Sequence, residues 1–291
     1  MLKKLIKYDI RANIKVIAGT YIFITLLAVV HLIMAKLSQM NPDGLQWMYL
    51  EKITFVLYFL SLVAGFVITI VACVLHFRKN MFKDEGYLLH TLPVNEAMIF
   101  TSKFVSTVIL LLGNIAGALI TAIICVGSIS WIRELFVKMT DGLKMSGLSS
   151  NALWFMFIFF IVAVFYSISQ IFASITIGYS LGKKINKDIM SFIIYFAEYV
   201  IMQILTIILV AAFAFGNGMV TQAMSELEII EKMQAYVAGV IGGSIVLMLV
   251  MAAVNCVLSV FFLNKKLNLD EQAGFLLYKY EKIVYISYKV I

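Results

Sequence analysis

The sequence predicts an all-α, polytopic membrane protein with six transmembrane helices, and two observations support this prediction. The hydrocarbon layer of a bilayer is about 30 Å thick, so a helix that rises 1.5 Å per residue needs roughly 20 apolar residues to cross it. Six apolar stretches meet this length: Val16 to Ala35, Ile53 to His76, Phe104 to Ser130, Leu153 to Leu181, Ile189 to Phe215 and Ala235 to Leu263. Composition agrees, since 63% of the residues are hydrophobic and only 13% are charged, against roughly 25% charged in soluble proteins.

The same stretches limit the domain organisation. No segment between two of them reaches the ~50 residues that an independent soluble domain requires. We therefore expect residues 1–291 to form a single transmembrane domain.

Lysine and arginine predict the orientation of the helices. Segments 1–15, 77–103, 182–188 and 264–291 lie on one side of the membrane if successive helices alternate in direction, and they hold 17 of the 23 basic residues. A cytoplasmic excess of Lys and Arg near helix ends sets topology during insertion, so both termini are expected in the cytoplasm. The net charge of +7 then reflects topology and contact with the lipid bilayer, and nucleic-acid binding is not expected because no single face collects the charge.

The first fifteen residues are predicted to form an amphipathic helix on the inner membrane surface. Apolar residues recur there at helical spacing, and basic residues fill the positions between them. The apolar set is Leu2, Leu5, Ile6, Ile10 and Ile14, and the basic set is Lys3, Lys4, Lys7 and Arg11. The alternative is an unstructured basic segment that only sets topology. A second short surface helix is predicted from Trp131 to Met139, in the outer headgroup region.

Glu198 is the only acid well inside a predicted span, about 13 Å beyond Ile189 at 1.5 Å per residue. Polar groups in lipid are costly unless they are paired or line a cavity. One hypothesis is a candidate polar path for substrate or protons, formed by Glu198, Gln203, Gln170, Asn114 and Asn255. The other is a neutral, hydrogen-bonded Glu198 near the inner interface, or one that reaches Lys184 or Lys187. Both hypotheses stay open at this stage.

Other chemistry-bearing residues are scattered. Cys73, Cys125 and Cys256 lie singly in different spans and the three histidines, His31, His76 and His90, form no ligand motif, so neither a disulfide framework nor a metal site is expected. The closest approach to a phosphate-binding loop, at Gly182, has Ile177 in place of the first glycine and Lys184 in place of the Ser or Thr. The chain is therefore not expected to hydrolyse ATP or to act as an enzyme by itself.

The segment between the second and third spans carries the most specific pattern, FRKNMFKDEGYLLHTLPVNEAMIFTSKF from Phe77 to Phe104. Apolar residues seven apart, Met81 with Leu88 and Phe82 with Leu89, predict a short helix with one apolar face, and Pro93 would end it. A rigid helix between two spans is suited to passing a push from a cytoplasmic partner into the membrane domain.

This segment resembles the coupling loop of bacterial ABC transporter permeases of the type-2 exporter class, in which an EGYL…TLP…SK pattern is common. The stretch DEGYLLHTLPVNEAMIFTSK, Asp84 to Lys103, carries the pattern here, and KKLNL at Lys265 to Leu269 is similar to the end of those permeases. The resemblance implies that the loop docks two separate ATPase subunits. The residues expected to take part are Lys83, Asp84, Glu85, Gly86, Tyr87, Leu88, His90 and Pro93.

The resemblance also implies a cell-membrane permease that pairs with a copy of itself or with a related permease. ATP and magnesium would bind to the partner ATPase, and no cofactor is expected on this chain. The expected cargo is amphipathic or apolar, such as a peptide, an antibiotic or a lipid. The tail from Asp270 to Ile291 extends beyond the KKLNL motif and has no predicted role.

Two other function classes remain open. The chain could be a proton-coupled carrier or channel that uses Glu198, although no internal repeat is evident. It could also be a membrane sensor or assembly subunit, whose loop docks a kinase or another membrane protein. An adjacent coding sequence for an ATPase would favour the exporter, and one for a sensor kinase would favour the sensor.

Overall fold

The computed structural model of the chain describes residues 2–41, 44–82, 95–128, 130–145, 152–182, 186–216 and 226–266. These ranges are almost entirely helical and contain no strand, which confirms the all-α prediction. The described helices are α1 (Leu2–Met40), α2 (Leu45–Phe82), α4 (Glu96–Val126), α5 (Ser130–Met145), α6 (Ala152–Leu181), α7 (Lys187–Gly216) and α8 (Glu226–Lys266).

Every one of these helices except α5 is long and apolar enough to cross a membrane, as predicted. The shortest of the six candidate spans has 29 residues and is therefore about 44 Å long, more than the ~30 Å hydrocarbon layer requires. Each candidate span is therefore long enough to cross the hydrocarbon even when it is tilted.

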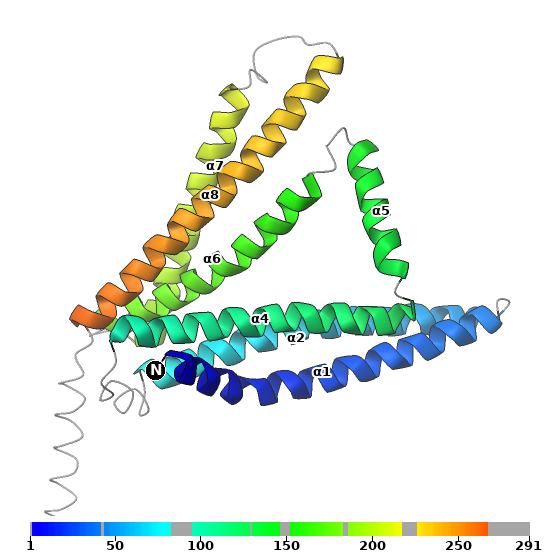
Figure 1. Cartoon of the computed structure of the whole chain (residues 1–291), viewed down its shortest axis with the longest axis horizontal. Coiled ribbons are helices and arrows are strands. Elements are labelled where there is room, and N and C mark those ends of the chain that lie inside the picture. Colours follow the sequence, from blue (N-terminus) through cyan, green and yellow to red (C-terminus); the bar gives the residue numbers. More distant parts are fainter. Residues whose placement is uncertain are drawn as a thin grey trace, which may run out of the picture.

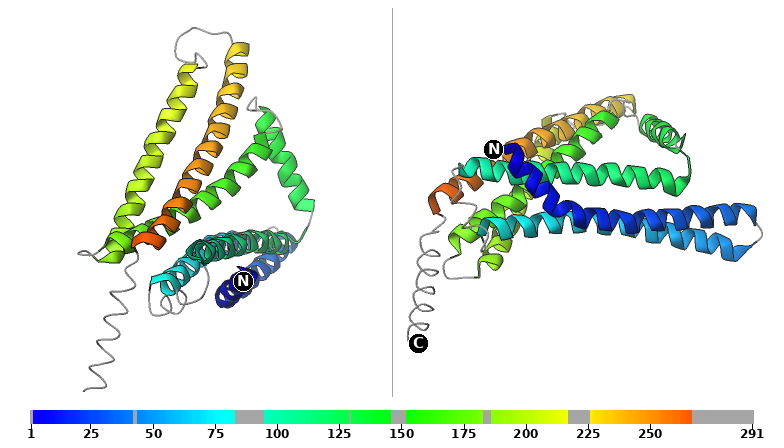
Figure 2. Two further views of the ribbon diagram at one scale, coloured as in Figure 1. Left: turned by 60° about the vertical axis from the view of Figure 1, so that its left-hand side comes forward. Right: turned by 60° about the horizontal axis from the view of Figure 1, so that its bottom comes forward.

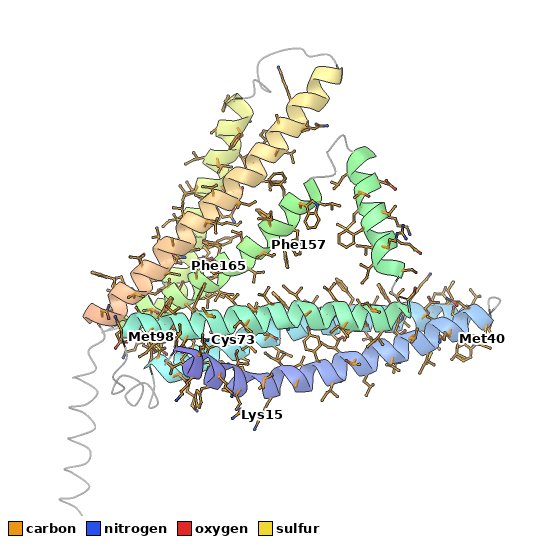
Figure 3. The ribbon with its side chains drawn as sticks, in the orientation of Figure 1. Lys15, Met40, Cys73, Met98, Phe157 and Phe165 are labelled. Atoms are coloured by element: carbon orange, nitrogen blue, oxygen red, sulfur yellow. The ribbon has the colours of Figure 1, made fainter. Side chains whose placement is uncertain are left out.

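Large apolar side chains cover the outer surface of these helices. Ile22, Phe192 and Val257 are each about 70% exposed, and many others are similarly placed. Figure 3 shows such side chains pointing away from neighbouring helices. A water-soluble protein rarely exposes so much continuous apolar surface, whereas lipid accommodates it. The chain is therefore a multi-pass membrane protein.

The long helices form two groups, which we call the first arm (α1, α2 and α4) and the second arm (α6, α7 and α8). Helices within an arm pack against one another extensively, and the arms contact each other much less. Figures 1 and 2 show that the arms meet at one end, called the vertex, and that the ends of α4 and α6 joined through α5 lie far from it.

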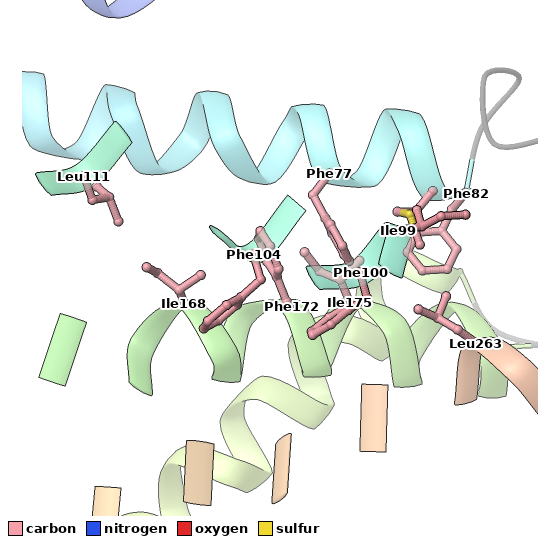
Figure 4. Packing of buried hydrophobic residues seen from close by; sticks show 11 residues of the cluster. Phe77, Phe82, Ile99, Phe100, Phe104, Leu111, Ile168, Phe172, Ile175 and Leu263 are labelled. Atoms are coloured by element: carbon pink, nitrogen blue, oxygen red, sulfur yellow. The ribbon is translucent and has the colours of Figure 1, made fainter. Parts of the chain in front are cut away.

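An aromatic cluster holds the arms together at the vertex (Figure 4). Phe77 of α2 stacks on Phe172 of α6, with ring centroids 4.0 Å apart and planes 9° apart. Phe100 and Phe104 of α4 meet Phe172 edge-on, each at 6.3 Å. Ring pairs of this kind stabilise packing beyond simple burial of area. The vertex is thus the main apolar core between the arms.

The ends of α4 correct both predicted boundaries of the third span. Asn95 caps the N-terminus, since its side chain accepts a hydrogen bond from the Ala97 backbone N–H, and the helix begins before the predicted Phe104. At the other end Gly127 adopts a φ of 72°, and its N–H donates to the Ile123 carbonyl. Left-handed backbone favours glycine, so the helix stops there. The predicted end at Ser130 is therefore wrong by one turn.

Residues 2–15 are helical, as predicted, but they form the beginning of α1 rather than a separate helix. Figure 2 shows that this beginning is bent relative to the rest of α1. Lys3, Lys7 and Arg11 are exposed, whereas Asp9 and Asn13 on another face are buried. The segment is therefore docked on the first arm through its predicted apolar side, which also carries the buried Asp9 and Asn13. The unstructured alternative is wrong.

The structure also describes two other predicted segments, at least in part. Residues 131–139 belong to α5, so the predicted short helix exists. The predicted tail at 264–291 begins inside α8, which ends at Lys266, and the remainder lies outside the described residues.

Candidate functional site

The predicted coupling segment, Lys83 to Pro93, lies outside the described residues, so its contacts stay a prediction. The residues on either side of it are described. α2 continues through Phe82 and α4 begins at Glu96, so the segment between these two helices is shorter than the predicted 77–103. Both flanking helix ends lie at the vertex (Figure 1).

A buried charged cluster links the two flanking helices to the beginning of α1. Asp9 of α1 is 1% exposed and Lys103 of α4 is 3% exposed, and the Lys103 ammonium contacts Asp9 Oδ1 directly. His76 Nε2 of α2 lies 3.2 Å from the same oxygen. Ser102 Oγ donates to Asp9 Oδ2 at 3.4 Å. One carboxylate therefore accepts hydrogen bonds from α2 and α4, one on each side of the coupling segment.

His76 Nε2 faces two groups that require opposite protonation states of this nitrogen. Asn80 Nδ2, an amide donor, lies 3.2 Å from it, and this contact is a hydrogen bond only when Nε2 carries no proton. The carboxylate of Asp9 can only accept, and an unprotonated Nε2 would place its lone pair against the Asp9 charge. We therefore assign the Nε2 proton to the bond with Asp9. Asn13 Nδ2 adds a further tie within α1, since it donates to the Asp9 backbone carbonyl at 3.2 Å.

In the sequence His76 is one of three scattered histidines, and neither Asp9 nor Lys103 is a predicted site residue. The fold nevertheless brings His76 to Asp9. A usable signal existed: Asp9 is the single acid in the basic segment 1–15, and Asn13 follows it by one helical turn. A lone acid on the apolar side of an amphipathic helix is costly to bury unless a cation meets it.

A second polar contact joins the two arms at the vertex. Arg78 Nη2 of α2 lies 2.9 Å from Asp188 Oδ2 in the first turn of α7, and the Tyr179 hydroxyl of α6 donates to Asp188 Oδ1 at 2.8 Å. Phe82, the last residue of α2, packs on the Tyr179 ring with centroids 4.6 Å apart. The final turns of α2 before the coupling segment therefore contact both arms.

The structure brings together only some of the candidate polar path residues. Ser174 Oγ of α6 donates to Glu198 Oε2 of α7 at 3.4 Å. One turn away on α6, Gln170 Nε2 donates to the Tyr195 backbone carbonyl at 3.4 Å. Gln170 and Glu198 thus lie at the same α6–α7 interface, where they bond to their neighbours.

The other three candidates differ in position and exposure. Asn114 is buried in the first arm, where it donates to Thr69 Oγ1 at 2.6 Å and its Oδ1 accepts from the Tyr21 hydroxyl at 2.9 Å. Asn255 is buried on α8, and Gln203 is exposed on α7. Since Asn114 lies in a different arm from Glu198, the five residues do not line one continuous seam.

Across the described ranges, no three His, Cys, Asp or Glu side chains come together in a group that could hold a metal ion. No protein-family model, curated protein or solved structure matches this chain. The function is therefore argued from the sequence motifs and from the geometry at the vertex.

Proposed function

We propose that the chain is the membrane-spanning permease subunit of an ATP-driven exporter. Separate ATPase subunits, which carry the ATP and magnesium, dock on the Lys83 to Pro93 segment, and two permease subunits move an amphipathic or apolar cargo outward. The observation that most supports this proposal is that the last turns of α2, directly before that segment, contact both arms.

The contacts at the vertex provide a route for a mechanical push. Displacement of the coupling segment moves the end of α2 that holds His76, Arg78 and Phe82. The Asp9 cluster makes α1, α2 and α4 move together, and the Arg78–Asp188 pair with the Phe82–Tyr179 contact passes the motion to α6 and α7. This is a rigid-body rotation of two packed groups about an interface.

The length of the helices amplifies such a rotation. α6 has 30 residues and is therefore about 45 Å long. A rotation of about 5° at the vertex would move the far end of a helix of this length by about 4 Å, on the same rise per residue. A small closure of the ATPase subunits would then alter the separation of the arms at the opposite membrane face.

We place the vertex on the cytoplasmic side of a bacterial cell membrane. The four segments that hold 17 of the 23 basic residues all begin or end at the helix ends that meet there. The positive-inside rule then puts both termini in the cytoplasm, where ATPase subunits can reach the coupling segment.

The test replaces the core of the coupling segment. Glu85→Ala combined with Gly86→Leu should lower both permease-stimulated ATPase activity and export, while the variant still folds and inserts. Glu134→Ala combined with Gly142→Leu makes the same chemical changes on the exposed surface of α5 and should leave both activities unchanged. Unaltered coupling in the Glu85 variant would remove this segment from the mechanism.

Two alternatives have distinct outcomes in a simpler experiment. The carrier hypothesis draws on Glu198, whose carboxylate is half-buried between α6 and α7. Co-purification in mild detergent separates two classes, since a bound ATPase supports the exporter and a bound sensor kinase supports the sensor. A transport assay on the purified protein tests the third, since transport without any nucleotide-binding partner supports the carrier.

A further inference from the structure

A cavity of about 260 Å³ lies between the arms, next to the aromatic cluster of the vertex. Its walls come from α2, α4 and α6, so both arms contribute. Protein interiors contain few voids larger than a water molecule, and an apolar cavity of roughly 150 Å³ is large enough to bind benzene. The cavity is therefore large enough to hold an apolar group.

The lining offers a ligand almost no hydrogen bonding. Most of the side chains are aliphatic or aromatic, and the two hydroxyl groups both point their protons at their own helix. Thr107 Oγ1 donates to the Lys103 carbonyl at 2.9 Å, and Ser167 Oγ donates to the Ala163 carbonyl at 2.8 Å. A bound water needs two to four polar partners, so water is a poor occupant. A hydrocarbon group suits this lining better than water does.

The cavity is elongated and has two different ends. Along α6 its lining runs from Phe160 to Phe172, which are twelve positions apart and therefore about 18 Å apart at 1.5 Å per residue. At the vertex end Phe172 is fully buried, whereas Phe160 at the other end is 49% exposed. The cavity thus has a closed end and an open mouth on the surface of the membrane domain. This shape fits one extended chain better than a compact ligand.

We propose that this cavity binds a single unbranched acyl or alkyl chain, inserted tail first toward Phe172. In a bilayer, an empty cavity would cost the contacts that its lining atoms otherwise make, so a chain of matching shape is favoured. This acyl or alkyl chain belongs either to a bilayer phospholipid or to an amphipathic cargo. The second source rests on the proposed function and narrows its cargo to molecules with a hydrocarbon tail.

The experiment uses photo-crosslinking of the full chain in vesicles of phosphatidylcholine and phosphatidylglycerol. One probe is phosphatidylcholine with a diazirine on its acyl chain, and the other is diazirine-labelled palmitic acid. Peptide mass spectrometry then locates the labelled residues. We expect labelling of Val164, Ile168 and other lining residues to exceed labelling of Phe192 and Ile207, which are exposed on α7.

A volume-filling variant tests the cavity itself. Ala163→Trp places a large side chain in the lining and should abolish the excess labelling, whereas Ala212→Trp adds the same side chain to an exposed position of α7 and should preserve it. Unlabelled palmitic acid should compete with the probe better than octanoic acid, because the cavity is long. If Ala163→Trp does not fold, the labelling pattern and the fatty-acid competition in the unmodified protein still test whether the cavity binds an acyl chain.

The outcomes separate the two sources and the failures. Labelling mainly by the phosphatidylcholine probe assigns the acyl chain to a bilayer lipid, and labelling mainly by the palmitic acid probe assigns it to a free amphipathic molecule such as a cargo. Equal labelling of the cavity and of the exposed α7 face, or no effect of Ala163→Trp, overturns the proposal. Since labelling needs no ATPase, it can succeed or fail independently of the exporter proposal.

Discussion

The Asp9–Lys103 pair makes the sharpest prediction about stability. Asp9 is 1% exposed and Lys103 is 3% exposed, so neither charge is solvated by water. Removing one member of a buried ion pair typically costs about 3–5 kcal/mol, because the other charge stays buried. We therefore expect Lys103→Met and Asp9→Asn each to lower the free energy of unfolding by about this amount.

The assay is thermal unfolding of the purified protein in one detergent. A change of 1 kcal/mol shifts Tm by about 2 °C in proteins at the large end of the surveyed range, so each single variant should lose about 6–10 °C. Lys7→Met removes an exposed lysine from the same N-terminal segment and should shift Tm by less than about 2 °C, as surface charges usually do.

The double variant distinguishes charge pairing from simple loss of packing. Replacing both members of a buried pair by neutral groups of similar size is often close to neutral. Asp9→Asn combined with Lys103→Met should therefore recover most of the stability, with a coupling energy of at least about 2 kcal/mol. Additive losses, or single variants no worse than Lys7→Met, would refute the argument that the two charges hold these helices together.

Three further predictions test the interfaces of the second arm and the vertex. A Cβ at Gly178 would lie 2.5 Å from the facing α7 backbone, so Gly178→Leu should lower the free energy of unfolding by at least about 1–3 kcal/mol. Gly113→Leu, at an open position on α4, should lower it by less than about 0.5 kcal/mol in the same assay. Arg78→Gln breaks a partly exposed ion pair, so stability should change by no more than about 1 kcal/mol while stimulated ATPase activity and export fall; intact coupling would show that this contact does not transmit motion. Glu198→Gln keeps a hydrogen-bond acceptor for Ser174 of α6, so the activation free energy of ATP-driven export should change by no more than about 1 kcal/mol. If the variant loses transport and the transport no longer depends on a proton gradient, the carrier is favoured instead.

The fold was largely predictable because lipid imposes a simple length rule. Six apolar stretches of sufficient length predicted the six long helices, and the end of α4 was missed because Gly127 stops that helix before the predicted Ser130. The candidate site was less predictable. Glu198 and Gln170 were correctly singled out as polar residues within spans, yet Asn114 shares no interface with them, since helix periodicity does not say which helices are neighbours.

The sequence by itself determined that the chain lies in a lipid bilayer and that its secondary structure is helical, because hydropathy and helical spacing are properties of single segments. Only the tertiary structure decided which polar residues meet. Asp9 and Lys103 are 94 positions apart, and Arg78 and Asp188 lie on different arms, so no local pattern relates them. Packing of the helices brings these charges together, and burial then makes their pairing matter, because a charge removed from water needs an opposite charge nearby.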